Sequence, residues 1–364
     1  MYPCQAETVA IPELDTKGDV YKTEGPNDPL IYDSTVGRMK AIMLYVDFSD
    51  AEMEIDTRER AKKVLGEGKF QELFDEQSYG KVSFEIEHVD GWRRLSKSHK
   101  EYSSKTTEAH RDLFVEIFSL YPEVDFLAYD HIMVNMPRIG NTAFGEREEI
   151  AIPYKGEKIK VALNISSASP YVLAHETAHC MGLPDLYSYG DAEGPKNPTG
   201  PWDIMSAAGR AGGFLGWHRH KLKWLDADRK TYLVEGKHQF NLAPLNASSG
   251  VSMITVPVDD PAKPSKVFVV ELAQPFRVLG KVGTGTGVLV YSVDAKLASG
   301  QNSVVVYPKA DLLNAPFQPG DRFEHKDAPF NLQVLKKNAD GSLRVEVEVQ
   351  TRQGGGAGVD KESS

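Results

Sequence analysis

The sequence predicts an α/β (α+β) fold, in which a mixed twisted sheet with helices is followed by an all-β, sandwich-like region. Three observations carry this prediction. Between about residues 38 and 166, short apolar runs typical of strands alternate with stretches of helical periodicity. From about residue 230 the helical pattern stops, and short apolar runs are separated by Gly, Pro, Asn and Asp. A chain of 364 residues is also longer than one hydrophobic core usually spans, which favours two domains.

The expected elements of the first part follow from the periodicity of their apolar residues. We expect, in chain order, a buried strand in RMKAIMLYVDFSD, helical spacing over residues 56–77 interrupted by Gly66 and Gly68, a half-buried strand in KVSFEIEHV, an amphipathic helix over 106–121, and strands in DHIMVNMP and KIKVALNIS. Strands that alternate with helices favour an open mixed sheet covered by helices.

The composition divides the chain into four stretches. Residues 1–37 are rich in Pro, Gly and Asp and predict an extended lead-in. Residues 38–226 form the expected first domain, and residues 230–350 the expected β-sandwich-like domain. The Gly-rich stretch 351–364 has the composition of a disordered tail.

Charge and hydropathy exclude several classes of partner. The net charge of −10 disfavours a nucleic-acid partner, because phosphate repels an acidic protein. No stretch approaches the roughly 20 apolar residues that cross a bilayer. The first residues carry neither a basic nor an apolar signal region, so we expect no signal peptide in the chain as given. Cys4 and Cys180 allow at most one disulfide, which leaves the compartment open.

Chemistry concentrates in the stretch PYVLAHETAHCMGLPDLYSY, residues 170–189. Ser169 can cap a helix whose first position Pro170 suits. On that helix His175 and His179 lie four residues apart, so both imidazoles project from one face and can bind one zinc ion. The neighbouring Glu176 then lies beside the metal, where it can act as a general base. The alternative interpretation is a structural helix that carries polar residues.

The residues after the helix strengthen the metal interpretation. Gly182 can end the helix in the left-handed conformation, and Pro184 prevents it from resuming. Asp185 is the first side chain beyond the turn that can bind zinc. Two histidines, one carboxylate and an open position are typical of a catalytic zinc site rather than a closed structural one.

Other third ligands fit less well. A rival geometry takes a Glu from a second helix, but the candidate helix over 207–225 contains no Asp or Glu, and Glu193 lies in a Gly- and Pro-rich loop. His218 and His220 on that helix are interpreted as surface or satisfied polar residues. Asp185 therefore remains the best candidate.

A methionine about twenty residues further on suggests a specific kind of site. Met205, in GPWDIMSAAG, is either a core residue beside a turn or the hydrophobic floor beneath the zinc, as in the Met-turn of metzincin-type peptidases. HETAHCMGLPDLY, WDIMS and GWHRHKLKWL together resemble the immune-inhibitor-A family of secreted metalloproteases, a metzincin-like group. MLYVDFSDAE, VFVVELAQP and GTGVLVYSVD are similar to that family as well.

The resemblance implies a secreted zinc endopeptidase that acts on protein or peptide substrates. It implies one catalytic Zn²⁺ held by His175, His179 and Asp185, with Glu176 as base, and a β-sandwich after the catalytic domain. It also implies that KIKVALNIS offers a strand edge to an extended substrate. We expect a monomer without nucleic-acid or membrane partners. The alternatives are an inactive peptidase-fold binding or adhesion module, and a zinc hydrolase with a non-peptide substrate.

Several residues near the motif have two interpretations. Tyr187 and Tyr189 either pack or stabilise the transition state by hydrogen bonding. Cys4 could bind the zinc as a thiolate and keep the enzyme latent. Cys180 projects about 100° away from His179 on the helix and is expected to be a small buried residue. Asp191 and Glu193 are candidate Ca²⁺ ligands, although their spacing matches no calcium loop.

Overall fold

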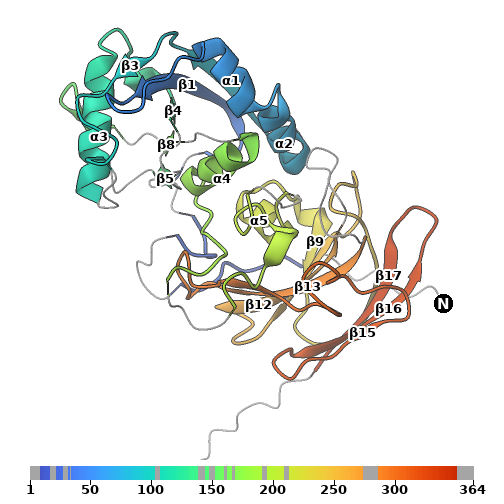
Figure 1. The fold of residues 1–364 in the computed structure, drawn as a ribbon. Coiled ribbons are helices and arrows are strands. Elements are labelled where there is room, and N and C mark those ends of the chain that lie inside the picture. The colour runs from blue at the N-terminus through green and yellow to red at the C-terminus, as the bar shows by residue number, and fades with distance from the viewer. Residues whose placement is uncertain are drawn as a thin grey trace, which may run out of the picture.

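The computed structural model describes residues 9–16, 22–27, 32, 34–102, 107–137, 144–146, 152–159, 162–165, 169–190, 195–208, 213–273 and 286–350. It shows a mixed α/β architecture with several sheets and few helices (Figure 1), which confirms the predicted class at that level. The predictions for Cys4, Asp191, Glu193 and the tail 351–364 lie outside the described residues.

A mixed, mostly parallel sheet forms the first layer. Its strand order is β2-β1-β4-β8-β5, and β5 alone runs antiparallel to its neighbour. A short strand, β3, also pairs in parallel with the end of β1. The strands are β1 Gly37–Asp47, β2 Val82–His88, β3 Arg93–Arg94, β4 His131–Asn135, β5 Phe144–Glu146 and β8 Ala162–Ile165.

Helices cover both faces of this sheet because alternate strand residues point to opposite sides. Met39, Ala41 and Met43 of β1 share a core with three helices, α1 Thr57–Leu65, α2 Lys69–Ser78 and α4 Pro170–Cys180. Ile42 and Leu44 share the other core with α3 Thr107–Leu120. The candidate metal helix α4 thus packs on the sheet, beside α1 and α2 (Figure 1).

From Lys230 onward the described elements are strands arranged in two sheets. One has the order β14-β13-β12-β11-β9, and the other β10-β17-β16-β15. All neighbouring pairs are antiparallel except β9 with β11. The strands are β9 Lys230–Tyr232, β10 Gly236–Leu242, β11 Met253–Pro257, β12 Lys266–Ala273, β13 Gly287–Asp294, β14 Val304–Val306, β15 Arg322–Phe323, β16 Phe330–Lys337 and β17 Leu343–Val349. Three short 3₁₀ turns are described before Lys230: η1 Phe126–Ala128, η2 Gly200–Trp202 and η3 Ala227–Arg229.

The five-stranded sheet is buried on both faces, which explains its nearly continuous apolar runs. Val270 and Val290 point toward the four-stranded sheet and share a core with it. Val269 and Tyr291 point the other way, into the core that also contains residues of α4, α1 and α2. The hydrophobic core is therefore continuous from the helical layer into the five-stranded sheet.

Two expected elements differ from the structure. The helix expected over 207–225 is described only as α5, Gly216–Lys221, because Gly213 has a φ of +128° and Leu215 is extended, with ψ at 155°. The single strand expected in KIKVALNIS is two strands in different sheets. β7 Glu157–Ile159 pairs with β6 Ile152–Tyr154, whereas β8 joins the main sheet.

The prediction that KIKVALNIS offers a free edge is also wrong. β8 pairs with β4 on one side and with β5 on the other, so the edge position belongs to β5. Periodicity identifies a strand, but it does not tell which neighbours the tertiary structure brings to it.

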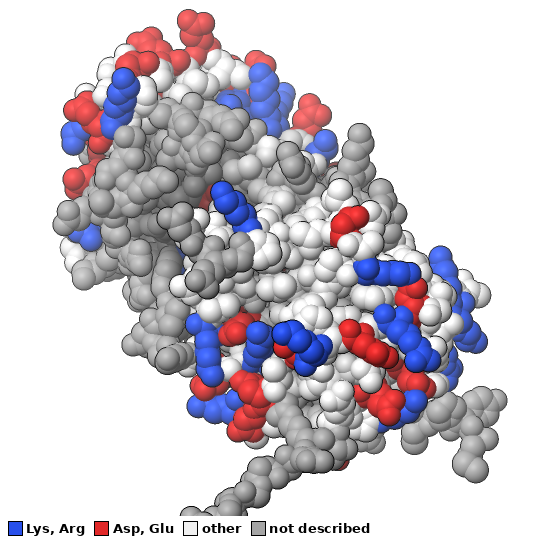
Figure 2. All heavy atoms as spheres, turned by 60° about the horizontal axis from the view of Figure 1, so that its bottom comes forward, with Lys and Arg blue, Asp and Glu red and all other residues white. Residues whose placement is uncertain are grey.

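The described surface carries both signs of charge. Figure 2 shows one face, on which the Lys and Arg side chains of the described residues lie among Asp and Glu rather than in one basic patch. Among the described helices, none is long and apolar enough to cross a membrane.

Candidate metal centre

Local signals define both ends of α4. The Ser169 side chain accepts a hydrogen bond from the Val172 amide, and Pro170 occupies the first turn. At the other end Gly182 has a φ of +91°, and a Cβ there would lie 2.4 Å from the Asn27 side chain. Asn27 donates to the Met181 carbonyl at 2.6 Å. Glycine is therefore needed both for the turn and for the close approach of the N-terminal segment.

Each helix histidine uses one ring nitrogen on a backbone carbonyl. His175 Nδ1 lies 2.9 Å from the Ile204 oxygen, and His179 Nδ1 lies 2.7 Å from the Leu183 oxygen. A carbonyl only accepts, so each Nδ1 carries the proton, and in the neutral ring Nε2 presents a lone pair. This arrangement is typical of metal-binding histidines, whose second nitrogen donates to a carbonyl or carboxylate.

The two Nε2 atoms meet the carboxylate of Asp185. Asp185 Oδ1 lies 3.1 Å from Nε2 of His175 and 3.3 Å from Nε2 of His179. Ligand atoms at zinc distances and tetrahedral angles are about 3.3 Å apart. Oδ1 is buried and receives no hydrogen bond among the described residues. Three electron-pair donors that face one another in this way fit a bound cation.

The electrostatics of the three side chains also favour positive charge at their meeting point. All three are buried, with 4–6% of each residue exposed. Burial lowers the pKa of His175, but the Asp185 and Glu176 carboxylates raise it to about 9. Burial raises the pKa of Asp185, yet the imidazoles of His179 and His175 hold it well below its usual range. A proton or a metal ion is therefore stabilised where the three meet.

Glu176 lies beside this group. Its carboxylate and the imidazole nitrogens of His175 and His179 lie within 4.8 Å of one another. Burial raises the pKa of Glu176, while the two imidazoles lower it less strongly. A carboxylate with a raised pKa is a better proton acceptor near neutral pH.

The two tyrosines occupy different positions. The Tyr189 hydroxyl donates to Asp185 Oδ2 and lies 3.2 Å from Ser299 Oγ. The Tyr187 ring lies nearly parallel to the His175 ring, with centroids 6.4 Å apart. Burial and the Asp185 charge raise the pKa of both phenols, so both keep their protons. Both can therefore act as hydrogen-bond donors.

Met205 lies in a turn that contacts both His175 on α4 and the segment that follows Asp185. The carbonyl of its neighbour Ile204 accepts from His175, and the Met205 carbonyl accepts from the Leu186 amide at 3.1 Å. Asp203 Oδ1 accepts from the Met205 amide at 2.8 Å. The Met205 side chain is fully buried. The turn thus connects His175 to the segment that carries Asp185.

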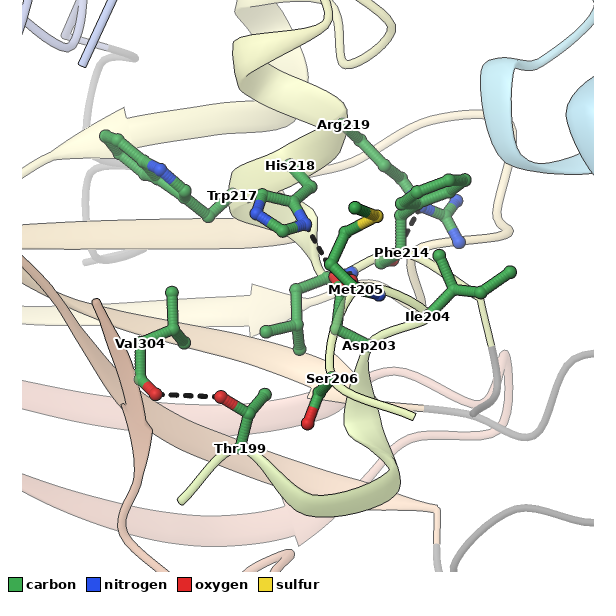
Figure 3. A network of polar contacts seen from close by, with 12 residues as sticks. Thr199, Asp203, Ile204, Met205, Ser206, Phe214, Trp217, His218, Arg219 and Val304 are labelled. Carbon is green, nitrogen blue, oxygen red and sulfur yellow. Dashed lines mark hydrogen bonds and ion pairs between the residues drawn. The ribbon is translucent and has the colours of Figure 1, made fainter. Parts of the chain in front are cut away.

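A buried ion network supports this turn (Figure 3). His218 is fully buried, and its Nδ1 lies 2.8 Å from Asp203 Oδ2, as the dashed line in Figure 3 marks. Its Nε2 lies 3.2 Å from Glu24 Oε1. Burial lowers the pKa of His218, but the two carboxylates raise it to about 10. For His218, the prediction of a surface residue is therefore wrong, whereas the prediction of a polar residue with satisfied partners is confirmed. No local pattern signals this network, because Glu24 and His218 are 194 residues apart.

Cys180 is buried, as expected, and its thiol donates to the Glu176 carbonyl at 3.4 Å. The thiol therefore points along the helix, toward its backbone.

Three solved structures are similar to the chain over most of its length. Two are wild-type OgpA from Akkermansia muciniphila, both 11% identical, with TM-scores of 0.31 and 0.32; they cover 93% and 95% of this chain and 96% and 98% of OgpA. The third is catalytically inactive OgpA with an O-glycopeptide (glycodrosocin) substrate, 12% identical, with a TM-score of 0.29, covering 93% of this chain and 96% of OgpA. The likeness is distant, and the chains superpose loosely.

No protein-family model and no curated protein matches the chain. The resemblance to immune inhibitor A therefore rests on the motifs quoted above.

Proposed function

We propose that the protein is a zinc-dependent endopeptidase. The observation that carries the proposal is the convergence of His175 Nε2, His179 Nε2 and Asp185 Oδ1, with both Nδ1 atoms engaged by carbonyls. The donor set of two imidazoles and one carboxylate is that of catalytic rather than structural zinc sites. Glu176, on the same helix, lies close to these atoms but is the less suitable third ligand, because Asp185 lies in direct contact with both imidazoles.

A zinc ion held by these residues would supply a Lewis acid that activates water and polarises a carbonyl group. Glu176 takes a proton from the attacking water as its oxygen bonds to the carbonyl carbon. When the C–N bond breaks, Glu176 gives that proton to the leaving nitrogen. The raised pKa of Glu176 suits a group that must both accept and release a proton.

Two neighbouring residues complete the proposed site. Tyr187 is the proposed stabiliser of the developing oxyanion, because its ring lies beside that of His175 and burial keeps its hydroxyl protonated. Met205 forms the apolar support under the histidines, as in the Met-turn of metzincin-type peptidases. The resemblance to the immune-inhibitor-A family supports the role of Met205, and it also implies secretion.

A peptide substrate is favoured over a small molecule by the sheet edge. β5 is the outermost strand of the main sheet in the described part of the chain, and α4 packs against it. An extended peptide can add to such an edge through backbone hydrogen bonds.

The test measures zinc and cleavage together. Zinc content is determined by elemental analysis in the wild type, in Glu176→Gln and in Glu235→Gln, which changes an exposed glutamate in the turn before β10. Each protein is then assayed for casein cleavage. We expect one zinc per chain in all three proteins. We also expect cleavage to fall about 100- to 10,000-fold in Glu176→Gln alone, because only that variant lacks the base.

The other outcomes separate the alternatives. Absence of zinc from the wild type after reconstitution contradicts the proposal. Zinc without cleavage of casein or of unfolded peptides in the wild type favours a binding module. Cleavage of ester or amide reporters, but of no peptide, favours a zinc hydrolase with a non-peptide substrate.

A further inference from the structure

We propose that a loop of the C-terminal sheets positions the third metal ligand. The loop joins β13 to β14, and its residues Ser299 and Gly300, together with Tyr189, contact Asp185 on three sides. We name Ser299, Gly300 and Tyr189 the Asp185 clamp. The inference rests on the proposed function, and it assigns these three as positioning residues for a zinc site.

The loop engages both backbone groups of Asp185. The Asp185 amide donates to Ser299 Oγ at 2.9 Å, and the Asp185 carbonyl accepts from the Gly300 amide at 3.1 Å. Ser299 lies 114 positions from Asp185 in sequence. Because both backbone groups are bonded, the Asp185 Cα is held at a defined place relative to α4.

The clamp also selects which carboxylate oxygen faces the histidines. The Tyr189 hydroxyl donates to Asp185 Oδ2, and Ser299 Oγ lies 3.2 Å from that hydroxyl. With Oδ2 bonded, Oδ1 is the oxygen turned toward Nε2 of His175 and of His179. Partners of this kind orient a ligand and typically change metal affinity by about 10- to 100-fold when removed.

Gly300 makes the contact with Tyr189 sterically possible. Its φ is +77°, and a Cβ built there would lie 2.2–2.6 Å from atoms of the Tyr189 ring. The Tyr189 amide also donates to the Gly300 carbonyl at 2.9 Å. Tyr189 is 52% exposed, so its place depends on these contacts rather than on core packing.

The loop is itself anchored, which a positioning role requires. The Ser299 amide donates to the Lys22 carbonyl at 2.9 Å, and Thr23 forms a β-bridge with Ala298. The Ala295 amide donates to the Ser265 carbonyl at 2.9 Å. The N-terminal segment and the C-terminal sheets thus hold the clamp from two directions.

The first experiment compares two glycines. Gly300→Ala introduces a methyl group against Tyr189, whereas Gly320→Ala places one in open space at a similar φ of +94°. Both variants suffer the backbone strain, but only Gly300→Ala displaces the tyrosine. Zinc dissociation constants are measured by competition with a chromophoric chelator. We expect affinity about 10- to 100-fold weaker in Gly300→Ala and near the wild-type value in Gly320→Ala.

The second experiment keeps the test valid if Gly300→Ala does not fold. Tyr189→Phe removes only the hydroxyl that bonds Asp185, and Tyr129→Phe removes the matching hydroxyl that donates to Glu87 at 2.7 Å. We expect weaker zinc binding, with faster release to the chelator, in Tyr189→Phe alone. Unfolding of the metal-free proteins should be alike in both variants, because the effect acts on the ligand.

The outcomes distinguish this inference from the proposed function. If the wild type binds zinc and Asp185→Ala weakens binding, but folded Gly300→Ala and Tyr189→Phe bind like the wild type, the clamp is contradicted. If Asp185→Ala binds zinc as the wild type does, the clamp fails together with the assignment of Asp185. If the wild type binds no zinc, the proposed function itself fails.

Discussion

The two sides of the candidate metal centre are held by different kinds of contact. His179 is oriented by Leu183, four residues later, and His175 by Ile204, 29 residues later. Asp185 is held by a loop 114 residues away. We call His175 and His179 the helix side of the site and Asp185 the aspartate side. The helix side depends mainly on the stretch of chain from residue 175 to residue 204, whereas the aspartate side depends on how the loop between β13 and β14 packs against Asp185.

This difference predicts that substitutions on the two sides weaken zinc binding in different ways. Changes near α4 should affect the ligands themselves, whereas changes in distant residues should affect geometry and affinity while the ligands remain. Substitutions on each side of the site test this distinction.

Removal of a helix ligand should have the largest effect. In His175→Ala we expect zinc below detection after dialysis and casein cleavage at the background rate, because one of three protein ligands is lost. Elemental analysis and the cleavage assay measure both. His238→Ala, on β10, is the control and should behave like the wild type. Full zinc occupancy in His175→Ala would show that the ion binds elsewhere.

Disruption of the buried network of His218, Asp203 and Glu24 tests whether the helix side depends on distant residues. His218→Leu leaves Asp203 and Glu24 buried without their shared cation, so we expect stability to fall by about 3–5 kcal/mol. Urea unfolding of the metal-free protein measures this. His238→Leu should change stability by less than about 0.5 kcal/mol.

The zinc affinity of His218→Leu decides the comparison. If the variant binds zinc as weakly as Gly300→Ala is expected to, the Ile204 carbonyl depends on the network and both sides of the site need distant support. If affinity is unchanged, the helix side is local.

The third prediction concerns pH and a carboxyl group beneath α5. Glu271 accepts hydrogen bonds from the Gly216 amide at 2.8 Å and from the Tyr291 hydroxyl at 2.7 Å. Burial raises its pKa from 4.5 to about 7. The folded state holds this proton more tightly than the unfolded state does. The stabilisation is therefore complete below pH 4.5 and is lost as the pH rises through about 7.

The shift corresponds to about 3 kcal/mol. Urea unfolding between pH 4.5 and 8 should show this loss in the wild type, beyond any change seen in Glu271→Gln, which stays neutral. Parallel pH profiles for the two proteins would contradict the assignment. Since Glu271 contacts the first turn of α5, which carries His218, the effect belongs to the support of the helix side.

The smallest effect is expected for the conservative change Met205→Leu in the apolar support. Met205→Leu conserves volume and should cost less than about 1.5 kcal/mol of stability, with zinc affinity near the wild-type value. Met205→Ala leaves a cavity and should cost about 2–5 kcal/mol. Thermal unfolding with and without zinc measures both. A large loss of zinc in Met205→Leu would mean that the sulfur does more than fill space.

Much of the first layer could be predicted from periodicity. The strands around Leu44 and Ile132 and the helices that begin at Thr57 and Thr107 appear where the apolar spacing places them. The errors arise where tertiary contacts override local pattern. The helix expected from residue 207 is shortened to α5, and the strand before α4 is divided between two sheets and covered by β5.

Local sequence is enough to define the helix side of the candidate site. Ser169, Pro170 and Gly182 mark the ends of α4, and a spacing of four residues places both imidazoles on one face, because these relations are set within a few helical turns.

Packing between separate segments selects the oxygen of Asp185 that faces the histidines, places Gly300 against Tyr189 and buries His218 between two carboxylates. Tyr189 bonds Asp185 from only four residues away, but Gly300 lies against it from 111 residues away, and Glu24 is 194 residues from His218. Contacts between such distant residues leave no local pattern. They form because the five-stranded sheet shares a continuous core with the helical layer.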